Sequence, residues 1–386
     1  IHSKNLLFKN LLVCKNMDNQ VIVIGTDHHN TLGIIRSLGE EGKLPIVMLP
    51  NLKLAFITKS KYINKVIWFD KPNDVIDILL RDYVNETNKA IIICAEDVSI
   101  SVIDSHYDLL KNLFLLPNAK KQGRINYFLN KDNMHELAMK VGLTVPKSWY
   151  LKSGDVLPTD IEFPCISKPC SSIVGGKNEI CVNRNIRELE VNIASNKDFL
   201  VQAFIEKDYE LNIVALAYNH GNDFIIPGVI RKIREYPVNS GSSSFSVLDD
   251  YKNYPEIELE KIKAFVGEIG YEGLFSVEFV VKDGIAYFLE INMRNDGNGY
   301  VPTSMGINLH YLWCKYLVGE PIVHPCNLNT PCYFMADTRD WVHVMKGRVS
   351  MKRWLEDKKK TSCYLLYNGK DQKPFFAFIR NKIFKI

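Results

Sequence analysis

Phe275–Arg294 reads FSVEFVVKDGIAYFLEINMR, and this stretch decides the fold. Two mostly apolar runs flank KDG at 282–284, the sequence form of a β-hairpin with a tight Asp-Gly turn. Side chains alternate between the two faces of a strand, so Glu290 and Asn292, two residues apart, share one face. Glu278 leaves the first strand. The hairpin therefore gathers two carboxylates and an amide near its middle.

These three side chains predict a magnesium site. Carboxylate and amide oxygens are hard ligands, and Mg²⁺ prefers a few protein oxygens together with phosphate and water. Arg294 lies two residues further along the same face, where a planar cation suits a phosphate or a developing anion. The alternative is a solvated polar face on an ordinary hairpin. We favour the metal site, with Glu278, Glu290 and Asn292 as ligands, because buried polar groups must be paired or metal-bound.

A phosphate-binding pattern precedes the hairpin in the chain. Leu129–Pro146 predicts a short helix with an apolar face, ended by glycine and proline. The apolar strand 163–169 carries Lys168 near its end and runs into the small-residue loop Ser171–Lys177. Small residues let backbone N–H groups approach an anion, and a lysine beside them neutralises phosphate charge. A Gly-Gly loop alone is weak support, since most are plain turns.

Together these segments resemble the ATP-grasp superfamily. The segments EF at 278–279 and EINMR at 290–294 are similar to its metal-binding signature. The other motifs occur in the expected order, and the resemblance covers about residues 126–317. The resemblance implies a fold that clamps MgATP between two α+β subdomains behind an N-terminal Rossmann-like domain. It also implies an acyl-phosphate made from a carboxylate and passed to an amine, as in the carbamoyl-phosphate synthetase and D-aspartate ligase branch.

The resemblance assigns the nucleotide-binding residues. Lys131 at the start of the helix and Lys168 contact ATP phosphates, and the loop after Lys168 is a lid. A strand after residue 199 presents backbone groups to adenine, with Gln202 where the family commonly has glutamate; its amide still accepts from the adenine amino group. Asp208 best fits the ribose position, with Glu210 as competitor. The full set is Lys131, Lys168, Ser172, Gly175, Gly176, Lys177, Gln202, Ala203, Phe204, Ile205, Asp208 and Glu210. The implied cofactors are ATP and two Mg²⁺ ions, for which Mn²⁺ substitutes.

Two further loops are expected to recognise the substrate. Residues 231–237 place three cations in four positions before a hydroxyl-rich loop, which predicts an anion-binding mouth; a solvated hairpin is the alternative. The glycine-containing loop 295–304 follows the metal strand and can wrap around a substrate. Arg294 and Arg231 are the expected catalytic cations. The expected substrate contacts in these loops are Arg234, Ser242, Ser243, Asn295, Asp296 and Gly297.

The N-terminal part predicts a small doubly wound domain. Apolar strands at 21–27, 45–49 and 91–97 and a helix at about 31–42 alternate as in a parallel α/β sheet. No GxGxxG follows the first strand, so a dinucleotide fingerprint is absent. Loops at the carboxyl ends of parallel strands still form a crevice, which makes Asp27 and His28 substrate candidates beside His29, Glu96 and Asp97. Each of these alone is more often a helix cap or a surface residue.

The remaining features indicate a cytoplasmic enzyme. The nine cysteines are odd in number and include no CxxC pair, which argues for reduced thiols. No apolar run is long enough to span a membrane, and the opening segment is too interrupted for a signal peptide. Met17 directly precedes the first strand, so we expect residues 1–16 to lie outside the native start.

The C-terminal segment is strongly basic. Trp341–Ile386 contains 12 Lys or Arg side chains and three acidic ones, a net charge of +9 in a chain whose total is +4. Its end places Phe376, Ile379, Ile383 and Ile386 on one helical face. This pattern fits a helix packed on its own domain, or an interfacial helix on anionic lipid. Nucleic acid is not expected as a partner, because no binding module for it is present.

We therefore predict a pre-ATP-grasp domain at 17–125, a small subdomain with the lid at 126–203, a metal and substrate subdomain at 204–325 and a basic extension at 326–386. The predicted activity is ATP-dependent carboxylate–amine ligation, possible roles including a cell-envelope or polysaccharide precursor. The alternatives are a carboxylating or nucleotide-biosynthetic relative, and a non-catalytic nucleotide-binding protein. The expected partners are a small carboxylate and amine, with a homodimer and weak membrane contact left open.

Overall fold

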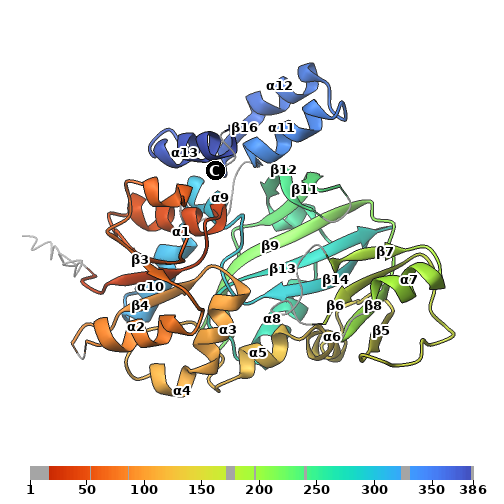
Figure 1. The fold of residues 1–386 in the computed structure, drawn as a ribbon, viewed down its shortest axis with the longest axis horizontal. Coiled ribbons are helices and arrows are strands. Elements are labelled where there is room, and N and C mark those ends of the chain that lie inside the picture. The colour runs from red at the N-terminus through yellow and green to blue at the C-terminus, as the bar shows by residue number, and fades with distance from the viewer. Residues whose placement is uncertain are drawn as a thin grey trace, which may run out of the picture.

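Three β-sheets organise the protein, and Figure 1 shows the N-terminal, large and small sheets from left to right. The computed structural model describes residues 17–383, apart from 53, 86, 171–178, 195–196, 239–240 and 323–330. The described residues form sheets of four, eight and four strands. A parallel sheet followed by two mainly antiparallel ones confirms the predicted order of a Rossmann-like domain and two α+β subdomains.

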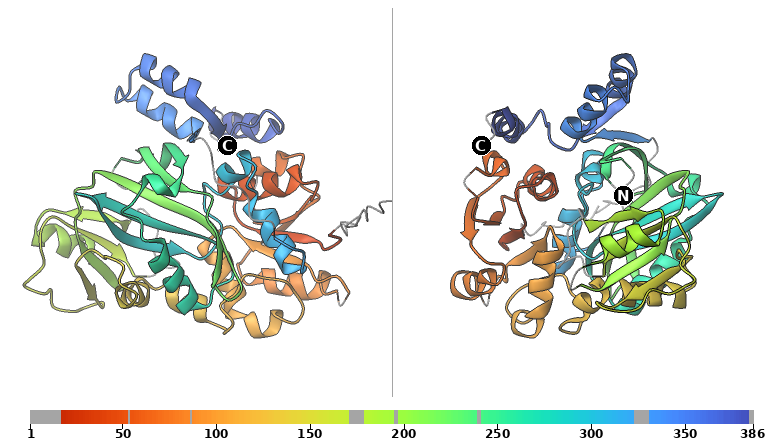
Figure 2. Two further views of the ribbon diagram at one scale, coloured as in Figure 1. Left: turned by 180° about the vertical axis from the view of Figure 1, so that it is seen from behind. Right: turned by 45° about the vertical axis from the view of Figure 1, so that its right-hand side comes forward.

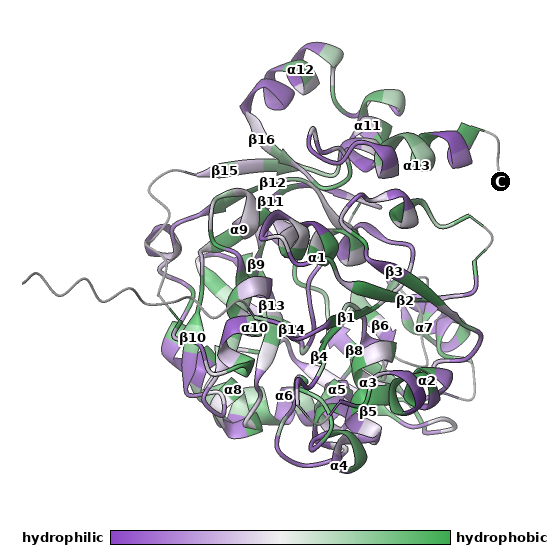
Figure 3. Ribbon diagram, turned by 90° about the vertical axis from the view of Figure 1, so that its left-hand side faces the viewer, coloured by the Kyte–Doolittle hydropathy of each residue, from purple (hydrophilic) through white to green (hydrophobic). Residues whose placement is uncertain are grey.

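The N-terminal sheet is parallel and has the strand order β3-β2-β1-β4. The strands β2 and β3 are added on one side of β1, and β4 is added on the other side, so the strand order switches between β1 and β4. A crevice forms outside the carboxyl ends of strands at such a switch point. In Figure 3, β1 and β2 are coloured as hydrophobic, as expected for strands covered on both faces. The bounds are β1 Val21–Ile24, α1 His29–Glu40, β2 Ile46–Pro50, η1 Phe56–Lys59, β3 Lys65–Phe69, α2 Asp74–Asp82, β4 Ile91–Cys94, α3 Asp97–Ser105 and α4 Tyr107–Leu110.

The small sheet has the order β5-β8-β6-β7 and is antiparallel throughout. Its one-sided core consists of Trp149, Leu151, Ile161, Cys165, Leu189 and Val201. The pairing of β8 with β6 brings the expected adenine strand beside the strand that carries Lys168. The bounds are β5 Ser148–Leu151, β6 Cys165–Pro169, β7 Cys181–Asn183, α7 Ile186–Asn192 and β8 Phe199–Ala203.

The large sheet contains the predicted hairpin as strands β13 and β14. Both turn residues, Asp283 and Gly284, have positive φ angles of 50° and 74°, the geometry that a tight Asp-Gly hairpin turn requires. The sheet order is β14-β13-β9-β11-β12-β15-β16, with β10 on β9. The bounds are β9 Tyr209–Tyr218, β10 Asp223–Ile225, β11 Val229–Tyr236, β12 Ser242–Asp249, β13 Gly273–Lys282, β14 Ile285–Asn292, β15 Cys332–Met335 and β16 Thr361–Tyr364.

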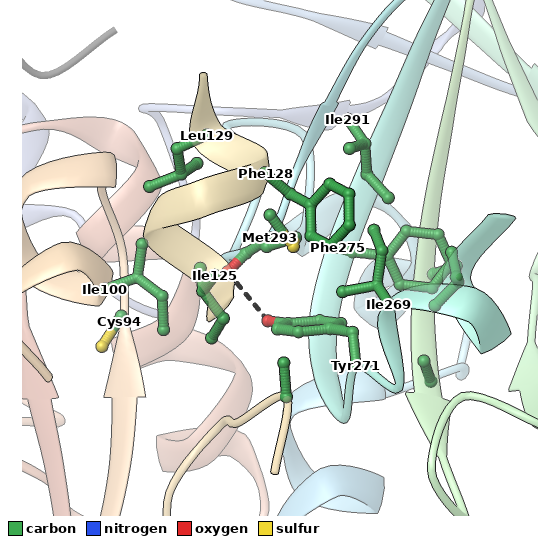
Figure 4. Packing of buried hydrophobic residues seen from close by; sticks show 14 of the residues in the cluster. Cys94, Ile100, Ile125, Phe128, Leu129, Ile269, Tyr271, Phe275, Ile291 and Met293 are labelled. Atoms are coloured by element: carbon green, nitrogen blue, oxygen red, sulfur yellow. Dashed lines mark hydrogen bonds between the residues drawn. The ribbon is translucent and has the colours of Figure 1, made fainter. Parts of the chain in front are cut away.

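One hydrophobic core joins the N-terminal domain to the large sheet. Figure 4 shows Tyr271 at this junction, with its hydroxyl 2.8 Å from the carbonyl oxygen of Met293. Helices α5 Arg124–Leu129, α6 Lys131–Lys140 and α8 Leu259–Ile269 contribute side chains to the same core. The labelled neighbours of Tyr271 are Cys94, Ile100, Ile125, Phe128, Leu129, Ile269, Phe275, Ile291 and Met293. The shared core fixes the N-terminal crevice relative to the hairpin.

The C-terminal segment packs on both the large sheet and the N-terminal domain instead of forming a separate layer. Strand β15 pairs with β12 and β16 with β15, so both belong to the large sheet. Helices α11 Asp337–Met345, α12 Met351–Lys360 and α13 Lys373–Ile383 lie together at the top of both views in Figure 2. Two helices, α9 Tyr300–Ser304 and α10 Leu309–Leu317, connect the hairpin to this segment.

The last helix packs on the N-terminal domain, but with a different face from the one expected. Phe378 meets Phe56 of η1 edge to face at 5.2 Å, and Ala377 is buried. Phe376 and Ile383, which were expected to face the core, are 59% and 68% exposed. The helix therefore turns Phe375 and Phe378 inward, and the residue Ile386 lies outside the described part of the chain.

Candidate functional site

The register of the β13–β14 hairpin brings the expected metal ligands to one face. Glu278 lies directly opposite Glu290, and Ser276 lies opposite Asn292. The intervening Val277 and Ile291 point to the other face and are buried in the core. A bulge after Glu278 places Phe279 opposite Phe288, which keeps both rings in the core despite the extra residue. The polar residues thus share a face while the apolar ones are buried beneath them.

Two lysines from the other subdomain face these carboxylates. The Nζ atom of Lys131, at the start of α6, lies 3.7 Å from Oε2 of Glu290. Burial is the main reason that the pKa of Lys168 falls to about 8, and the charge of Lys131 acts in the same direction. Glu290 and Glu278 oppose that shift. Two cations and two carboxylates therefore converge, and the described residues include no group of three or more His, Cys, Asp or Glu side chains placed to hold a metal.

A buried histidine that no sequence motif indicates lies behind this cluster. Nε2 of His135 lies 2.9 Å from the carbonyl oxygen of Leu289 in β14. Burial and then the charge of Lys168 lower the pKa of His135 to about 4, so the imidazole is neutral at pH 7. The amide of Gln202 lies 3.4 Å from its Nδ1 and donates to the hydroxyl of Ser148 at 3.0 Å. These contacts fix the orientation of the Gln202 side chain.

The strand expected to hold adenine has two of its backbone donors already in use. Ala203 N–H donates to the carbonyl of Lys147 at 2.9 Å, and Phe204 N–H donates to Pro164 at 3.1 Å. The Ile205 N–H has no hydrogen-bond partner within the described ranges. Of the hinge residues named from sequence, Ile205 is therefore the one whose backbone can donate to a ligand.

The two ribose candidates occupy different environments. Asp208 accepts from the Asp283 N–H at 2.9 Å and from Lys282 at 3.0 Å, and these bonds lower its pKa. Its carboxylate therefore stabilises the hairpin turn. Glu210 is hydrogen-bonded to Lys207 and Lys232. It lies one strand away from Glu278 on the sheet face that carries the expected metal ligands, called the metal face below for that expectation, so the geometry favours Glu210 over Asp208.

The structure corrects the expected orientation of Arg231. Arg231 lies opposite Leu211 in the β9–β11 ladder, on the face that covers the hydrophobic core, and its guanidinium stacks on the ring of Tyr209 at 4.5 Å. Because side chains alternate along a strand, the neighbouring Lys232 points to the metal face instead. Burial acts to lower the pKa of Lys232, but the charges of Glu278 and Glu210 raise it. Lys232 is thus the cation that β11 supplies.

Arg234 is also corrected, because it belongs to a buried ion cluster. Its Nη2 lies 2.7 Å from Asp340 in α11, and its Nη1 lies 2.6 Å from Asp357 in α12. These carboxylates satisfy its donors, so it fastens the C-terminal helices to β11. The other candidates on this edge, Ser242 and Ser243, begin β12. The hydroxyl of Ser243 is buried and has no hydrogen-bond partner in the part of the chain that the structure describes.

Arg294 connects the metal face to the N-terminal domain. Its Nε donates to Oδ1 of Asp97 at 2.9 Å, and its Nη2 donates to the amide oxygen of Asn292 at 3.0 Å. Burial acts to lower the pKa of Arg294, but Asp97, Asp296 and Glu290 raise it above the usual value. The guanidinium therefore stays charged beside the expected metal ligands.

The loop after Arg294 is less open than expected. Asn295 is 2% exposed, and its amide contacts Asn30 and the ring of His310. Asp296 accepts from the hydroxyl of Ser276 at 3.0 Å. Both side chains are therefore hydrogen-bonded within the protein, and their role as substrate contacts stays a prediction. A Cβ atom on Gly297 would lie 3.2 Å from Nε2 of His29, so Gly297 lets the loop approach the N-terminal domain closely.

Of the N-terminal candidates, Glu96 lines a cavity at the carboxyl ends of the parallel strands, whereas Asp27 and His28 do not. Asp27 accepts from the Ile57 N–H at 3.0 Å, and His28 caps α1 by accepting from Asn30 N–H at 3.2 Å. Thr26 and Glu96, which are hydrogen-bonded to each other, line a cavity of about 230 Å³ there. Burial raises the pKa of Glu96. The lid candidates Ser172, Gly175, Gly176 and Lys177 lie outside the described residues.

Comparisons with known proteins agree with this architecture. The family model of the ATP-grasp domain matches residues 136–306. The carbamoyl phosphate synthase large chain of Gemmatimonas aurantiaca is 27% identical over 199 residues, which cover 48% of this chain and 18% of that protein. The same protein of Methanothrix thermoacetophila is 24% identical over 212 residues, covering 52% and 19%. The match thus spans only about a fifth of these relatives. None of the described helices is long and apolar enough to cross a membrane.

Solved structures resemble this chain over most of its length. The biotin carboxylase of Campylobacter jejuni, in its βγ-ATP complex, superposes with a TM-score of 0.61 at 16% identity, covering 82% of this chain and 75% of that one. An ADP complex of N5-carboxyaminoimidazole ribonucleotide synthetase gives 0.63 at 14% identity, covering 82% and 80%. The L-amino acid ligase of Bacillus licheniformis gives 0.60 at 15%, covering 78% and 74%. At these identities the likeness shows the fold alone. Residues 136–306 of this chain thus form an ATP-grasp domain, and the chain is distantly similar to part of the carbamoyl phosphate synthase large chains.

Proposed function

We propose that this protein is an ADP-forming ligase that joins a carboxylate to an amine through an acyl-phosphate. The observation that carries the proposal is the convergence of Lys131 and Lys168 on Glu278 and Glu290 across two subdomains. These carboxylates and lysines suit a bound nucleotide. Its phosphates would pair with the lysines, and they would also supply the metal ligands that the protein does not.

The two lysines neutralise ATP phosphates in this proposal. Glu278, Glu290 and the amide oxygen of Asn292 fit Mg²⁺, since they offer hard oxygens and too few of them to enclose the ion. These side chains would hold Mg²⁺, two ions in this proposal, or Mn²⁺ in their place, and the metal would neutralise phosphate charge. Asn292 already accepts one hydrogen bond from Arg294, and an amide oxygen has a second lone pair for a metal.

The adenosine part of ATP fits the hinge between the two sheets. The Ile205 N–H offers a donor to a ring nitrogen, and the amide oxygen of Gln202 accepts from the adenine amino group. Glu210 accepts from the ribose hydroxyls, and its two lysine neighbours keep it ionised. The pKa of Glu210 is lowered: burial acts to raise it, but Lys232 and Lys207 outweigh that effect.

Arg294 has the catalytic role closest to the transferring phosphoryl group. It is charged, and Asp97 and Asn292 hold it in one orientation. A fixed cation beside the site of developing negative charge stabilises the transition state at little reorganisation cost. Lys232 takes the place that the sequence assigned to Arg231. Rate enhancement then comes from positioning and charge neutralisation.

Two alternative functions can be told apart from the proposed one by ADP release. A carboxylating or nucleotide-biosynthetic reaction is favoured by the likeness to the biotin carboxylase and the N5-carboxyaminoimidazole ribonucleotide synthetase. A carboxylating enzyme would release ADP only when bicarbonate is present, whereas an amide ligase needs a carboxylate and an amine. A non-catalytic nucleotide-binding protein would bind MgATP and release no ADP with any substrate pool.

Oxygen isotopes test the proposed reaction. The protein is incubated with MgATP and pools of amino acids, sugar acids and amines to find the pair that releases ADP. With oxygen-18 in the carboxylate, one labelled oxygen should appear in inorganic phosphate, because the acyl-phosphate transfers it when the amine attacks. Release of AMP and pyrophosphate would point to an acyl-adenylate and contradict the proposal.

A homodimer and contact with a membrane are further predictions about the partners of this protein. A homodimer should give twice the chain mass in light scattering at micromolar concentration. Weak contact with anionic membrane is supported by the exposed Phe376 and Ile383 near basic residues of α13. Sedimentation with anionic vesicles at low salt tests it, and binding should vanish as salt rises.

A further inference from the structure

The cavity beside Glu96 has mostly apolar walls. It lies at the carboxyl ends of the four strands of the N-terminal sheet and extends between helices α2 and α3. Phe69 at the end of β3, Val75 of α2 and Val102 of α3 are among its lining residues. Further along the same helices, Leu79 and Ile103 are fully buried in the main core. The space between α2 and α3 is therefore filled by side chains except at this edge of the sheet.

The size of the cavity suits a group of a substrate. Its volume is about 230 Å³. Protein interiors are packed so closely that voids larger than a water molecule are few. An apolar void of about 150 Å³ stays dry and binds a molecule the size of benzene, whereas sites for whole drug-sized ligands start at about 300 Å³. A branched aliphatic chain or a single ring therefore fits the cavity.

The charge at the cavity wall favours a cation. Glu96 is the one ionisable side chain among the lining residues that the structure describes. The hydroxyl of Thr26 donates to its Oε1 atom. A carboxylate offers about four lone-pair positions, so Glu96 can accept from a ligand as well as from Thr26. A primary ammonium group supplies such donors together with the complementary charge, whereas a carboxylate ligand would be repelled.

The wall that carries Glu96 is joined to the strand that carries Arg294. Asp97 follows Glu96 directly and accepts from Nε of Arg294 at 2.9 Å. The N–H of Asn295 donates to the carbonyl of Cys94, the last residue of β4, at 3.2 Å. Glu96 therefore borders both the apolar cavity and the contact that orients Arg294. A group bound at Glu96 lies on the side of the cavity that is bonded to the hairpin.

We propose that this cavity binds the amine substrate, a primary amine with a compact apolar substituent. The substituent occupies the space between α2 and α3, and the ammonium group donates to Glu96. The inference rests on the ligase activity proposed above and narrows its amine to this class. Glu96 and the cavity walls are specificity-determining in this assignment, and the phosphoryl-transfer groups remain Lys131, Lys168 and Arg294.

The first test measures binding of small amines to the full chain, without turnover. The probes are methylamine, propylamine and 3-methylbutylamine, with 3-methylbutan-1-ol as the uncharged counterpart, titrated by ligand-detected NMR. Burial of each methylene group strengthens binding by up to about fourfold. We expect 3-methylbutylamine to bind at least about 10-fold more tightly than methylamine and at least about fivefold more tightly than the alcohol. An affinity that is independent of chain length overturns the proposal, whether or not the protein is a ligase.

Variants locate the bound amine. Val98 lines the cavity and is 39% exposed, so Val98→Phe can fill the cavity without entering the packed core. Val102→Phe fills it from the next turn of α3. Both should remove the dependence on chain length, and Glu96→Gln should remove only the preference for amine over alcohol. The matched control is Val191→Phe on α7, where the side chain is 75% exposed. If both filled variants are folded by circular dichroism and bind the probes as the control does, the cavity is not the site.

The second test uses turnover with the substrates found by ADP release. Val98→Phe should raise KM for an apolar amine at least about 10-fold, the loss expected when about two buried methylene groups are displaced, and change KM for ATP by less than about twofold. If the wild type turns over and both filled variants match Val191→Phe, or if only polar amines are substrates, the cavity assignment is wrong and the ligase stands. If no pool yields ADP but the filled variants lose 3-methylbutylamine binding, the ligase proposal fails and the cavity site stands.

Discussion

The Nε atom of Arg294 donates to Oδ1 of Asp97 at 2.9 Å, which joins the end of the metal strand to the start of α3 in the N-terminal domain. The same guanidinium donates to Asn292 at 3.0 Å. Arg294 is thus held between a carboxylate of one domain and an expected metal ligand of another. The N-terminal domain therefore helps to orient Arg294 beside the expected metal ligands.

Asp97→Asn tests this positioning. The amide keeps the shape of the carboxylate but removes its charge, so Arg294 should lose its orientation while remaining in the protein. We expect kcat to fall about 10- to 100-fold, the loss typical of removing an outer partner of a site residue, with ATP affinity unchanged. Asp82→Asn, which breaks only the exposed pair with Arg81, is the control. A kcat equal to that of the control would show that Asp97 does not position Arg294.

Glu290→Gln tests the metal assignment. Glutamine retains the size of the side chain but is a poor Mg²⁺ ligand, and it removes the charge that faces Lys131 at 3.7 Å. We expect substrate-dependent ADP release to fall at least about 100-fold, as for loss of a main electrostatic contribution, with an unchanged circular dichroism spectrum. The matched control is Glu268→Gln, whose carboxylate pairs with Lys140 at the surface. Turnover near the wild-type rate would remove Glu290 from the metal site.

The lowered pKa of Lys168 predicts that ATP affinity depends on pH. Burial lowers its pKa to about 8, so the free protein carries the charge below pH 8 and loses it above. ATP should therefore bind most tightly below pH 8 and more weakly as the pH rises from 8 to 9.5. Calorimetry in buffers of different ionisation heat should show proton uptake on binding in that range. Lys168→Arg, which stays charged, should bind with a flat pH profile; the same slope in that variant would assign the titration to another group.

The sequence was sufficient for the hairpin because its signals are local. A tight turn fixes the register, and the alternation of Glu290, Ile291 and Asn292 then sets which side chains share a face. The parallel strands were recognisable from continuous apolar runs. Strand β3 was missed because Lys65–Phe69 is an edge strand with exposed positions, including Trp68 at 41%. Such a strand lacks the buried run that marked its neighbours.

Sequence reasoning failed where orientation depends on distant partners. Arg231 and Lys232 are adjacent cations, and only the pairing of β11 with β9 shows that Lys232 faces Glu210. Arg234 is removed from the substrate mouth by Asp340, 106 residues later in the chain. The contact between Arg339 and His28 likewise joins residues 311 positions apart, which no local motif indicates.

Asp371 should contribute strongly to stability, because it forms a buried junction between the C-terminal segment and the N-terminal domain. Its carboxylate lies 3.2 Å from Nε of Arg36, accepts from the hydroxyl of Ser60 at 2.8 Å, and both charged side chains are at most 1% exposed. Asp371→Asn leaves the Arg36 charge buried without its counter-ion, which typically costs about 3–5 kcal/mol. Urea unfolding should show this loss. A change within about 0.5 kcal/mol, as expected for surface substitutions, would mean that water reaches the pair.

Substitutions at Phe378 and Phe376 of α13 distinguish the packing of this helix on the protein from membrane contact by its exposed face. Phe378 lies against Phe56, whereas Phe376 is 59% exposed, so the same substitution has different expected effects at the two positions. Phe378→Ala should lower the free energy of unfolding by about 1–3 kcal/mol, less than for a fully buried ring. Phe376→Ala should change it by less than about 0.5 kcal/mol.

Urea unfolding and sedimentation with anionic vesicles are measured on both variants. If Phe376→Ala weakens vesicle binding and spares stability, the exposed face contacts lipid; if neither the variant nor the wild type binds vesicles at low salt, membrane contact is excluded. Equal destabilisation by the two variants would contradict the packing face seen here, because Phe378 belongs to the cluster shared with the N-terminal domain and Phe376 does not.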